Sequence, residues 1–269
     1  FNYLICFHKQ FYILLIIDYI NMNMTKLLKL SIFFSLAFWG LINFLNAEPF
    51  ESTYTPLPSQ NIIIRNANIY DGEGNELLNT DLLIKDRKIA AIGNDLPVTD
   101  DFEVIDASGK WVTPGIIDIH SHMGVYPAPG VRTSSDGNEA TSPVTADVWA
   151  EHSIWVQDPQ YTLALSGGVT AFHILPGSAN LIGGRGVTVK NLQRNTINSM
   201  KFPNAPHSLK MACGENPKRV YGNRQQAPST RMGNIAGYRK AWIEAEAYLN
   251  RLNEYEAKSD EAKEMGYKP

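Results

Sequence analysis

The stretch from Val112 to Gly124 constrains the fold of this chain more than any other, because it ends a short apolar segment in two histidines. It reads Val-Thr-Pro-Gly-Ile-Ile-Asp-Ile-His-Ser-His-Met-Gly. Pro114-Gly115 and Met123-Gly124 bound the segment with turn residues, which predicts a strand between them. Successive side chains of a strand point to opposite faces, so His120 and His122 share one face and could share one metal ion.

A bare His-x-His pair does not identify a metal site, since two histidines can also line a core with hydrogen-bonded nitrogens. The flanking sequence adds a second signal, because a β-rich segment and the run Ile105-Asp-Ala-Ser-Gly-Lys110 precede the histidines. Together these motifs resemble the amidohydrolase superfamily, and within it the imidazolonepropionase-like branch, from about Asn61 to Tyr238. The resemblance implies that His120 and His122 bind a divalent metal, usually zinc, at the end of the first strand of a barrel.

The composition indicates a protein with a substantial core and excludes one class of partner. The 269 residues are 44% hydrophobic and carry a formal net charge of -3. This length allows one large or two modest domains. Without a broad basic surface, nucleic acid is not an expected partner. Cys6 and Cys213 are the only cysteines, so we expect no disulfide and predict that Cys213 is a buried small apolar residue.

The first 47 residues resemble an export signal preceded by an upstream segment. Residues 1–23 show no pattern that predicts a structural element, and we exclude them from the predicted fold. Residues 24–47 have the order of a signal peptide, with a positive start, an apolar middle and Asn46-Ala47 before Glu48. We expect an exported, periplasmic or secreted protein that meets the membrane only through this signal. The alternative is an uncleaved anchor, although the apolar part is shorter than the roughly 20 residues of a membrane span.

Residues 48–113 are predicted to form a small antiparallel β-sandwich. Three β-branched runs suggest strands at 61–70, 81–85 and 88–93. The turn residues Asp71 to Gly74 and Asp86-Arg87 separate them, as in consecutive hairpins.

Residues 114–269 are predicted to form the N-terminal part of a hydrolase barrel, so the fold class is α/β: an incomplete (β/α)8 TIM-type barrel after the sandwich. We expect a loop at 126–145, helices at 146–157 and 160–165, and a buried strand at 169–175. The segment is shorter than the about 250 residues of a usual complete barrel. The resemblance therefore implies an amino-terminal part that lacks two later histidine ligands and the general-base aspartate.

Lys210 is the third predicted metal ligand. It lies inside the apolar run Ser208 to Gly214, where burying an unpaired ammonium would be costly. The resemblance implies that its amine is carboxylated and bridges two metal ions. The alternative is a lysine that reaches solvent or Glu215.

A glycine-rich segment, Leu181 to Lys190, follows the predicted strand at 169–175. It lacks Gly-Lys-Ser/Thr, so the sequence does not favour a phosphate-binding loop. We expect its glycines to let the backbone approach the site. The resemblance places Ser178, Asn180 and Arg185 near the substrate.

The last part of the chain contains a polar stretch and a helix. Residues 216–231 are predicted to be a loop. An apolar stripe then predicts one helix that packs against the barrel rather than in a coiled coil; its members are Ile235, Tyr238, Trp242, Ala245, Leu249 and Leu252. His152 and His173 stay outside the predicted ligand set. His173 could approach the site from its strand, but we expect it to be a hydrogen-bonded core histidine.

The predicted function is hydrolysis of carbon–nitrogen bonds in an amide, dipeptide or cyclic amide, by water that one or two metal ions activate. The substrate is a small molecule, and an oligomer is possible. We expect no turnover from this chain by itself. Two alternatives stay open: an exported binding protein that kept the fold without catalysis, and a membrane-anchored protein.

Overall fold

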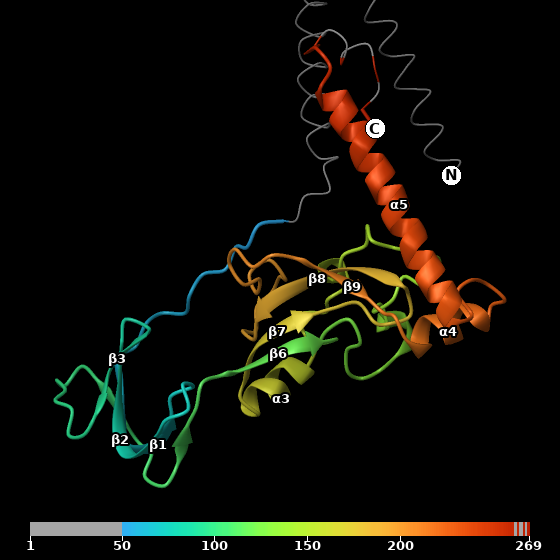
Figure 1. Ribbon diagram of the computed structural model, residues 1–269. Helices are drawn as coiled ribbons and strands as arrows, with labels where there is room; N and C mark the ends of the chain where they lie inside the picture. The colour runs from blue at the N-terminus through green and yellow to red at the C-terminus, as the bar shows by residue number, and fades with distance from the viewer. Residues whose placement is uncertain (1–49, 261–262, 264–265, 267) are drawn as a thin grey trace, which may run out of the picture. The chain divides into compact units, whose positions relative to one another are not determined.

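The computed structural model describes residues 50–260, 263, 266, 268 and 269, and two sheets lie within this part (Figure 1). From Glu51 onward the chain forms one compact unit. The predicted upstream segment 1–23 and signal peptide 24–47 lie outside the described residues. None of the described helices combines the length and the apolar character of a membrane span.

The first sheet has five strands in the order β3-β2-β1-β4, with β5 also paired to β1. The strands are β1 Ile62–Tyr70, β2 Glu76–Lys85, β3 Lys88–Gly93, β4 Glu103–Asp106 and β5 Trp111–Val112. The two predicted hairpins are confirmed, and Asp86 (φ 51°) and Arg87 (φ 63°) take the left-handed conformation that a tight two-residue turn requires.

The antiparallel prediction is wrong for β4 and β5, which both run parallel to β1. After β3 the chain crosses from one edge of the sheet to the other side of β1, and it enters there in the same direction as β1. These strands form one mixed sheet in the described part of the chain rather than the expected antiparallel sandwich. Their shared core is small and consists of Ala67, Ile69, Leu82 and Ala107.

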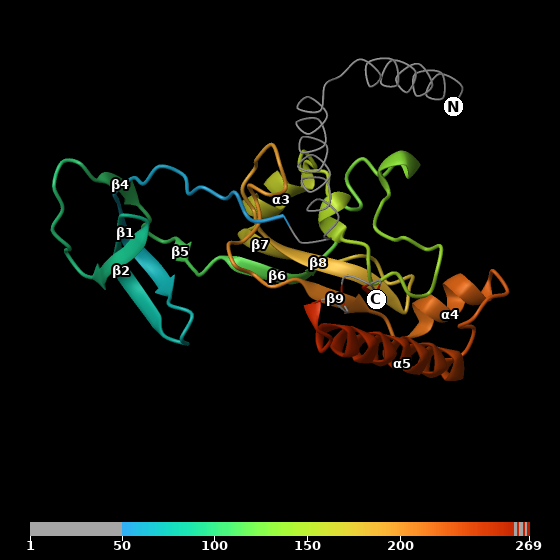
Figure 2. The same ribbon diagram turned by 90° about the horizontal axis from the view of Figure 1, so that it is seen from above.

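The second sheet has the order β6-β7-β8-β9 and carries the predicted site (Figure 2). Its strands are β6 Ile116–Ser121, β7 Val169–Ile174, β8 Ile182–Lys190 and β9 Ser208–Met211. The predicted β-α-β unit is confirmed, because β6 and β7 are parallel and helix α3, Gln160–Ser166, lies between them in the sequence.

Strand β8 departs from the parallel barrel pattern, since it is antiparallel to both β7 and β9. The connection from β7 to β8, residues 175–181, is too short for the crossover that a parallel neighbour needs, which takes about a dozen residues or more. The chain therefore reverses at once. The core behind this sheet consists of Val125, Ala150, Tyr161, Phe172, Ile174, Val187, Val189 and Met200.

One helix prediction and two loop predictions need correction. Residues 146–157 form only a short 3-10 turn, η3 (Ala150–His152), because Trp149 before it is extended and the side chain of Glu151 turns inward to Lys201. A second 3-10 turn, η2 (Arg132–Ser134), interrupts the predicted loop at 126–145. The predicted loop at 216–231 begins instead as a helix, α4 (Glu215–Gly222).

The last element, α5 (Arg231–Glu256), confirms the predicted helix. Thr230 caps it, since its hydroxyl oxygen accepts a hydrogen bond from Gly233 N at 3.0 Å. The predicted packing of the whole stripe is wrong: Ile235, Trp242 and Leu249 remain 57%, 54% and 52% exposed. The helix contacts the rest of the unit through a different face, where Gly237 approaches Leu181 so closely that a Cβ would clash.

Candidate metal centre

The end of β6 brings the two predicted histidine ligands beside each other. His120 is in the last part of β6 and His122 follows its end. Their ring centroids are 5.4 Å apart and the rings meet edge to face. Asp118 Oδ1 accepts a hydrogen bond from His120 N at 3.1 Å, which ties that carboxylate to the backbone. The strand thus presents two imidazoles at its carboxyl end, as predicted.

A backbone carbonyl orients the ring of His122. Its Nδ1–H donates a hydrogen bond to the Leu175 carbonyl oxygen at 2.8 Å. A carbonyl oxygen can only accept, so Nδ1 is the donor, and Nε2 is the nitrogen through which His122 could bind a metal ion. The backbone at the end of β7 therefore orients this imidazole.

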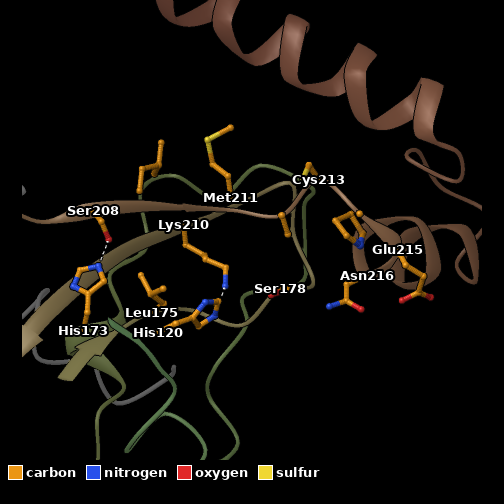
Figure 3. Close-up of a pocket in the computed structure, with 14 residues that line it drawn as sticks. His120, His173, Leu175, Ser178, Ser208, Lys210, Met211, Cys213, Glu215 and Asn216 are labelled. Carbon is orange, nitrogen blue, oxygen red and sulfur yellow. Dashed lines mark hydrogen bonds between the residues drawn. The ribbon is translucent and has the colours of Figure 1, made fainter. Parts of the chain in front are cut away.

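Lys210 joins this pair from β9, which lies at the opposite edge of the sheet. Its Nζ is hydrogen-bonded to Nε2 of His120 at 3.1 Å, and Figure 3 shows the two side chains pointing at each other. The lysine is only 7% exposed, and burial lowers the pKa of its amine. Lys210 is the largest cause that lowers the pKa of His120, followed by burial and His122. A proton on Lys210 therefore disfavours a proton on His120, and the uncharged imidazole is the form that binds metals.

The alternative partner for Lys210 is engaged elsewhere. Glu215 Oε1 accepts a hydrogen bond from Arg219 Nε at 3.0 Å, and both side chains are exposed. Within the part of the chain that the structure describes, no carboxylate lies at ion-pair distance from Lys210. The buried amine therefore faces an imidazole rather than an acidic group.

An open pocket of about 640 Å³ surrounds this contact, a size suited to a small molecule. Its lining includes His120, His173, Leu175, Ser178, Ser208, Lys210, Cys213, Glu215 and Asn216. Cys213 is exposed, which corrects the prediction that it is buried.

His173 lines the pocket, but other groups hold both of its ring nitrogens. Nδ1 lies 2.9 Å from Thr188 Oγ1 and Nε2 lies 2.7 Å from Ser208 Oγ. Burial lowers its pKa, with smaller contributions from His120 and His207. His173 is thus a hydrogen-bonded histidine, as predicted, although it borders the site. Sequence reasoning missed Ser208; the signal was its position two residues before Lys210 on the same face of one strand.

The three predicted substrate residues lie in different places. Ser178 lines the pocket with His120 and Lys210. Asn180 is 1% exposed, and its Nδ2 donates to Glu139 O at 2.6 Å, Ser142 O at 2.8 Å and Thr145 Oγ1 at 3.1 Å. Arg185 is exposed on β8, with its guanidinium 4.3 Å from the ring centroid of Trp149. Neither Asn180 nor Arg185 is among the lining residues of this pocket.

The glycines of β8 allow this strand to contact a neighbouring loop. This contact lies beside the pocket and not inside it. Gly184 has a φ of 107°, and a Cβ there would lie 2.5 Å from the carbonyl oxygen of Val148. Arg185 N donates to that same oxygen at 2.7 Å. Glycine at this position therefore permits the contact between β8 and the loop that carries Trp149.

Among the described residues, no group of three or more His, Cys, Asp or Glu is placed to hold a metal ion. The predicted set, His120, His122 and Lys210, consists of two imidazoles and one amine. This set provides two imidazole nitrogens of the kind that zinc accepts, and a carboxylated lysine would supply oxygen.

Sequence comparison finds similarity to proteins that are named as hydrolases. No family model matches the chain. The protein "Amidohydrolase tasK" from Hapsidospora irregularis is 36% identical over 198 residues, which cover 69% of this chain and 20% of that protein. A dihydroorotase from Lactobacillus helveticus is 45% identical over 74 residues, or 28% of this chain and 16% of that enzyme.

A solved structure of an amidohydrolase from Thermotoga maritima MSB8 has a TM-score of 0.66 and 37% sequence identity. The match covers 76% of this chain and 55% of that one. The chain thus spans about a fifth of the length of the first curated relative and about half of this structure. The imidazolonepropionase-like branch stays a prediction. The agreement of sequence, fold and relatives shows that this chain belongs to the amidohydrolase superfamily.

Proposed function

We propose that His120, His122 and Lys210 are the part of a catalytic metal centre that this chain contributes to a hydrolase of carbon–nitrogen bonds. One observation carries the proposal: a buried lysine amine lies 3.1 Å from Nε2 of His120, and no acidic partner lies within ion-pair distance among the described residues. The relatives support the coarser statement, a metal-dependent hydrolase. The bond type and the residue roles are our proposal.

The residues fit a divalent cation, and we propose zinc, as one or two ions. His122 would bind through Nε2, because Leu175 holds its other nitrogen. His120 would bind through the lone pair that now faces Lys210. Such a cation supplies a water of lowered pKa and polarises a substrate carbonyl. The sheet keeps both imidazoles in place beside the pocket.

Lys210 would contribute as a carbamate. Its neutral amine would attack carbon dioxide, so that a bond forms between Nζ and the carbon while one carbon–oxygen π bond opens and a proton leaves to water. The product carries a negative charge and two oxygens in place of an amine. This conversion would remove the cost of burying an ammonium without a counter-charge.

The pocket would hold a small amide, a dipeptide or a cyclic amide next to the histidines. Ser178 lines it and would donate a hydrogen bond to the substrate. Asn180 and Arg185 were predicted to be near the substrate; from their positions, Asn180 would shape the site by holding the loop at 139–145. Dihydroorotate belongs among the compounds to assay, because a dihydroorotase is one of the relatives.

We also propose that this chain by itself does not turn over substrate, and that the protein is exported. A catalytic zinc usually has three protein ligands and a water, and the described residues supply two imidazoles and one lysine. An exported binding protein on the same fold is the second candidate. Both candidates predict metal binding, and they differ in hydrolysis.

The test compares bound metal and hydrolysis in purified protein and two matched variants. His120→Ala removes a proposed ligand, whereas His152→Ala removes an exposed histidine that does not line the pocket. We expect the first variant to lose bound zinc and the second to retain it. Hydrolysis is then assayed on a panel of dipeptides and cyclic amides, with this chain alone and with a form extended by the rest of its gene. Equal zinc content in both variants would contradict the metal site, and zinc binding without hydrolysis in the extended form would favour the binding protein.

A further inference from the structure

One face of α5 is apolar and exposed. Ile235, Trp242 and Leu249 recur every seven residues, close to two helical turns, so they lie in one row. Each is more than half exposed, and every residue from 242 to 251 is exposed as well. Figure 1 shows α5 as the longest helix of the described part.

The contacts of α5 with the rest of the unit lie along one side of this row. The Tyr238 hydroxyl donates hydrogen bonds to the carbonyls of Leu181 and Ala212, and Asn234 Nδ2 donates to Cys213 O. Further along, the Tyr248 hydroxyl donates to Pro269 O. Tyr238 thus borders the row, three residues after Ile235 and four before Trp242, whereas the three members of the row remain more than half exposed.

Two opposite charges lie along the same row. Arg239 is one turn after Ile235, and Glu246 is one turn after Trp242. Both are exposed, and neither forms an ion pair among the described residues, whereas the neighbouring Lys240 and Glu244 lie 3.8 Å apart. The face thus carries an apolar row whose first half is basic and whose second half is acidic.

We propose that this face binds the same face of a second copy of the chain, with the two α5 helices antiparallel. When Trp242 lies opposite Trp242 of the partner subunit, Ile235 comes opposite Leu249 of the partner subunit. The same register places Arg239 beside Glu246 of the partner subunit, and the two-fold axis makes that pair twice. A parallel arrangement would instead place Arg239 next to its own copy, which like-charge repulsion disfavours. The charge order therefore selects the antiparallel dimer.

The dimer is expected to be reversible. Three large apolar residues from one helix make an interface smaller than the about 1,600 Å² of a standard complex. We expect a dissociation constant on the order of micromolar, weaker at high salt because the two charge pairs lie at the exposed rim.

The experiment measures the dissociation constant of the full chain by analytical ultracentrifugation over a dilution series. Trp242→Glu should raise the constant at least about 100-fold, because it places two carboxylates at the axis. Arg239→Glu and Glu246→Arg should each raise it about tenfold, and combining the two changes should restore it. Lys240→Glu, a matched charge change away from the row, should leave it unaltered. Circular dichroism confirms that each variant keeps its helix content.

A second measurement detects the axis directly. In protein that carries Cys6→Ala and Cys213→Ala, mild oxidation of Trp242→Cys should give a disulfide-linked dimer, whereas Lys240→Cys should give none. A monomer at about 100 micromolar, a dimer indifferent to Trp242→Glu, or a combined charge exchange that fails to restore association would each overturn the proposal. A monomer whose Trp242 is protected from solvent would overturn it too, by showing that another segment of the same chain covers the face.

Discussion

Two lysines are buried to nearly the same depth, and their surroundings are opposite. Lys201 is 4% exposed, and its Nζ lies 2.8 Å from each carboxylate oxygen of Glu151. Lys210 is 7% exposed and faces the imidazole of His120. A buried charge that has a counter-charge belongs to the architecture, and a buried amine without one is available for chemistry. The comparison therefore distinguishes the two lysines by their surroundings, without reference to any relative, and it is the basis for our proposal that Lys210 has a functional role.

Among the predicted changes, we expect the largest effect on turnover from replacing His120, the residue that contacts Lys210. In the extended form of the hydrolase described under "Proposed function", His120→Ala should lower turnover about a thousand-fold, because the several kcal/mol that a bound metal supplies would be lost. Steady-state kinetics and the free energy of unfolding are measured together. If the variant lost much of its stability but kept its turnover, His120 would have a structural role like that of Glu151, and not a catalytic one.

Exchanging each lysine for methionine sharpens the contrast in stability. Lys201→Met leaves the carboxylate of Glu151 buried without its cation, so the free energy of unfolding should fall by about 3 to 5 kcal/mol. Lys210→Met removes a buried amine and should change it by less than about 1 kcal/mol, in either direction. Urea unfolding measures the free energy of unfolding of both variants. An equal decrease in the two variants would contradict the difference that we propose between the two lysines.

A second compensated charge lies in the first sheet, where Arg65 and the backbone N–H groups of Asn66 and Leu96 donate to the buried carboxylate of Asp81. Burial alone would raise the pKa of Asp81, but the hydrogen bonds outweigh it and hold the pKa below its usual 3.8. A depressed folded-state pKa adds stability above the unfolded-state pKa and loses it as the pH falls through the folded-state value.

Asp81→Asn should therefore destabilise this sheet by about 2 kcal/mol at pH 7, and the difference from the native protein should shrink as the pH falls below about 4. Hydrogen exchange of the backbone amides in β1 and β2 measures the stability of this sheet at each pH. A difference that stays constant between pH 7 and pH 3 would show that shape, rather than charge, matters at this position.

Ser208→Ala should have the smallest effect. His173 loses one hydrogen bond but keeps the one to Thr188, so the free energy of unfolding should fall by about 1 kcal/mol, and turnover of the extended form by less than tenfold. Zinc content should not change. A loss of zinc in this variant would show that His173 supports the metal centre more directly than its hydrogen bonds indicate.

The elements that the sequence predicted correctly are those whose cause is local. Asp86-Arg87 specify a turn by themselves, and the glycines after α3 end that helix before β7. The parallel pairing of β4 with β1 and the direction of β8 depend on where distant segments meet, which no short pattern records.

In the candidate site, too, local features could be predicted from the sequence and long-range contacts could not. The strand alternation that groups His120 with His122 is local and could be predicted. The contact of Lys210 with His120 joins residues 90 positions apart, and the resemblance, not the pattern, suggested it. The ion pair of Lys201 with Glu151 was missed, because Glu151 lies in the segment 146–157 that was predicted to be a helix. The exposure of Trp242 was missed because a stripe shows which face is apolar and not what covers it.

The central claim is that the uncompensated lysine belongs to a metal centre, and zinc bound per chain tests it most directly. Purified native protein, Lys210→Ala and Lys240→Ala are loaded with zinc, dialysed and analysed for metal by mass spectrometry. We predict that zinc falls in Lys210→Ala and is unchanged in Lys240→Ala, an exposed control, and that added acetate partly restores zinc binding in Lys210→Ala by replacing the missing carboxylate. Unchanged zinc in Lys210→Ala would contradict the claim and would direct attention to Glu215, the acidic residue in the same pocket.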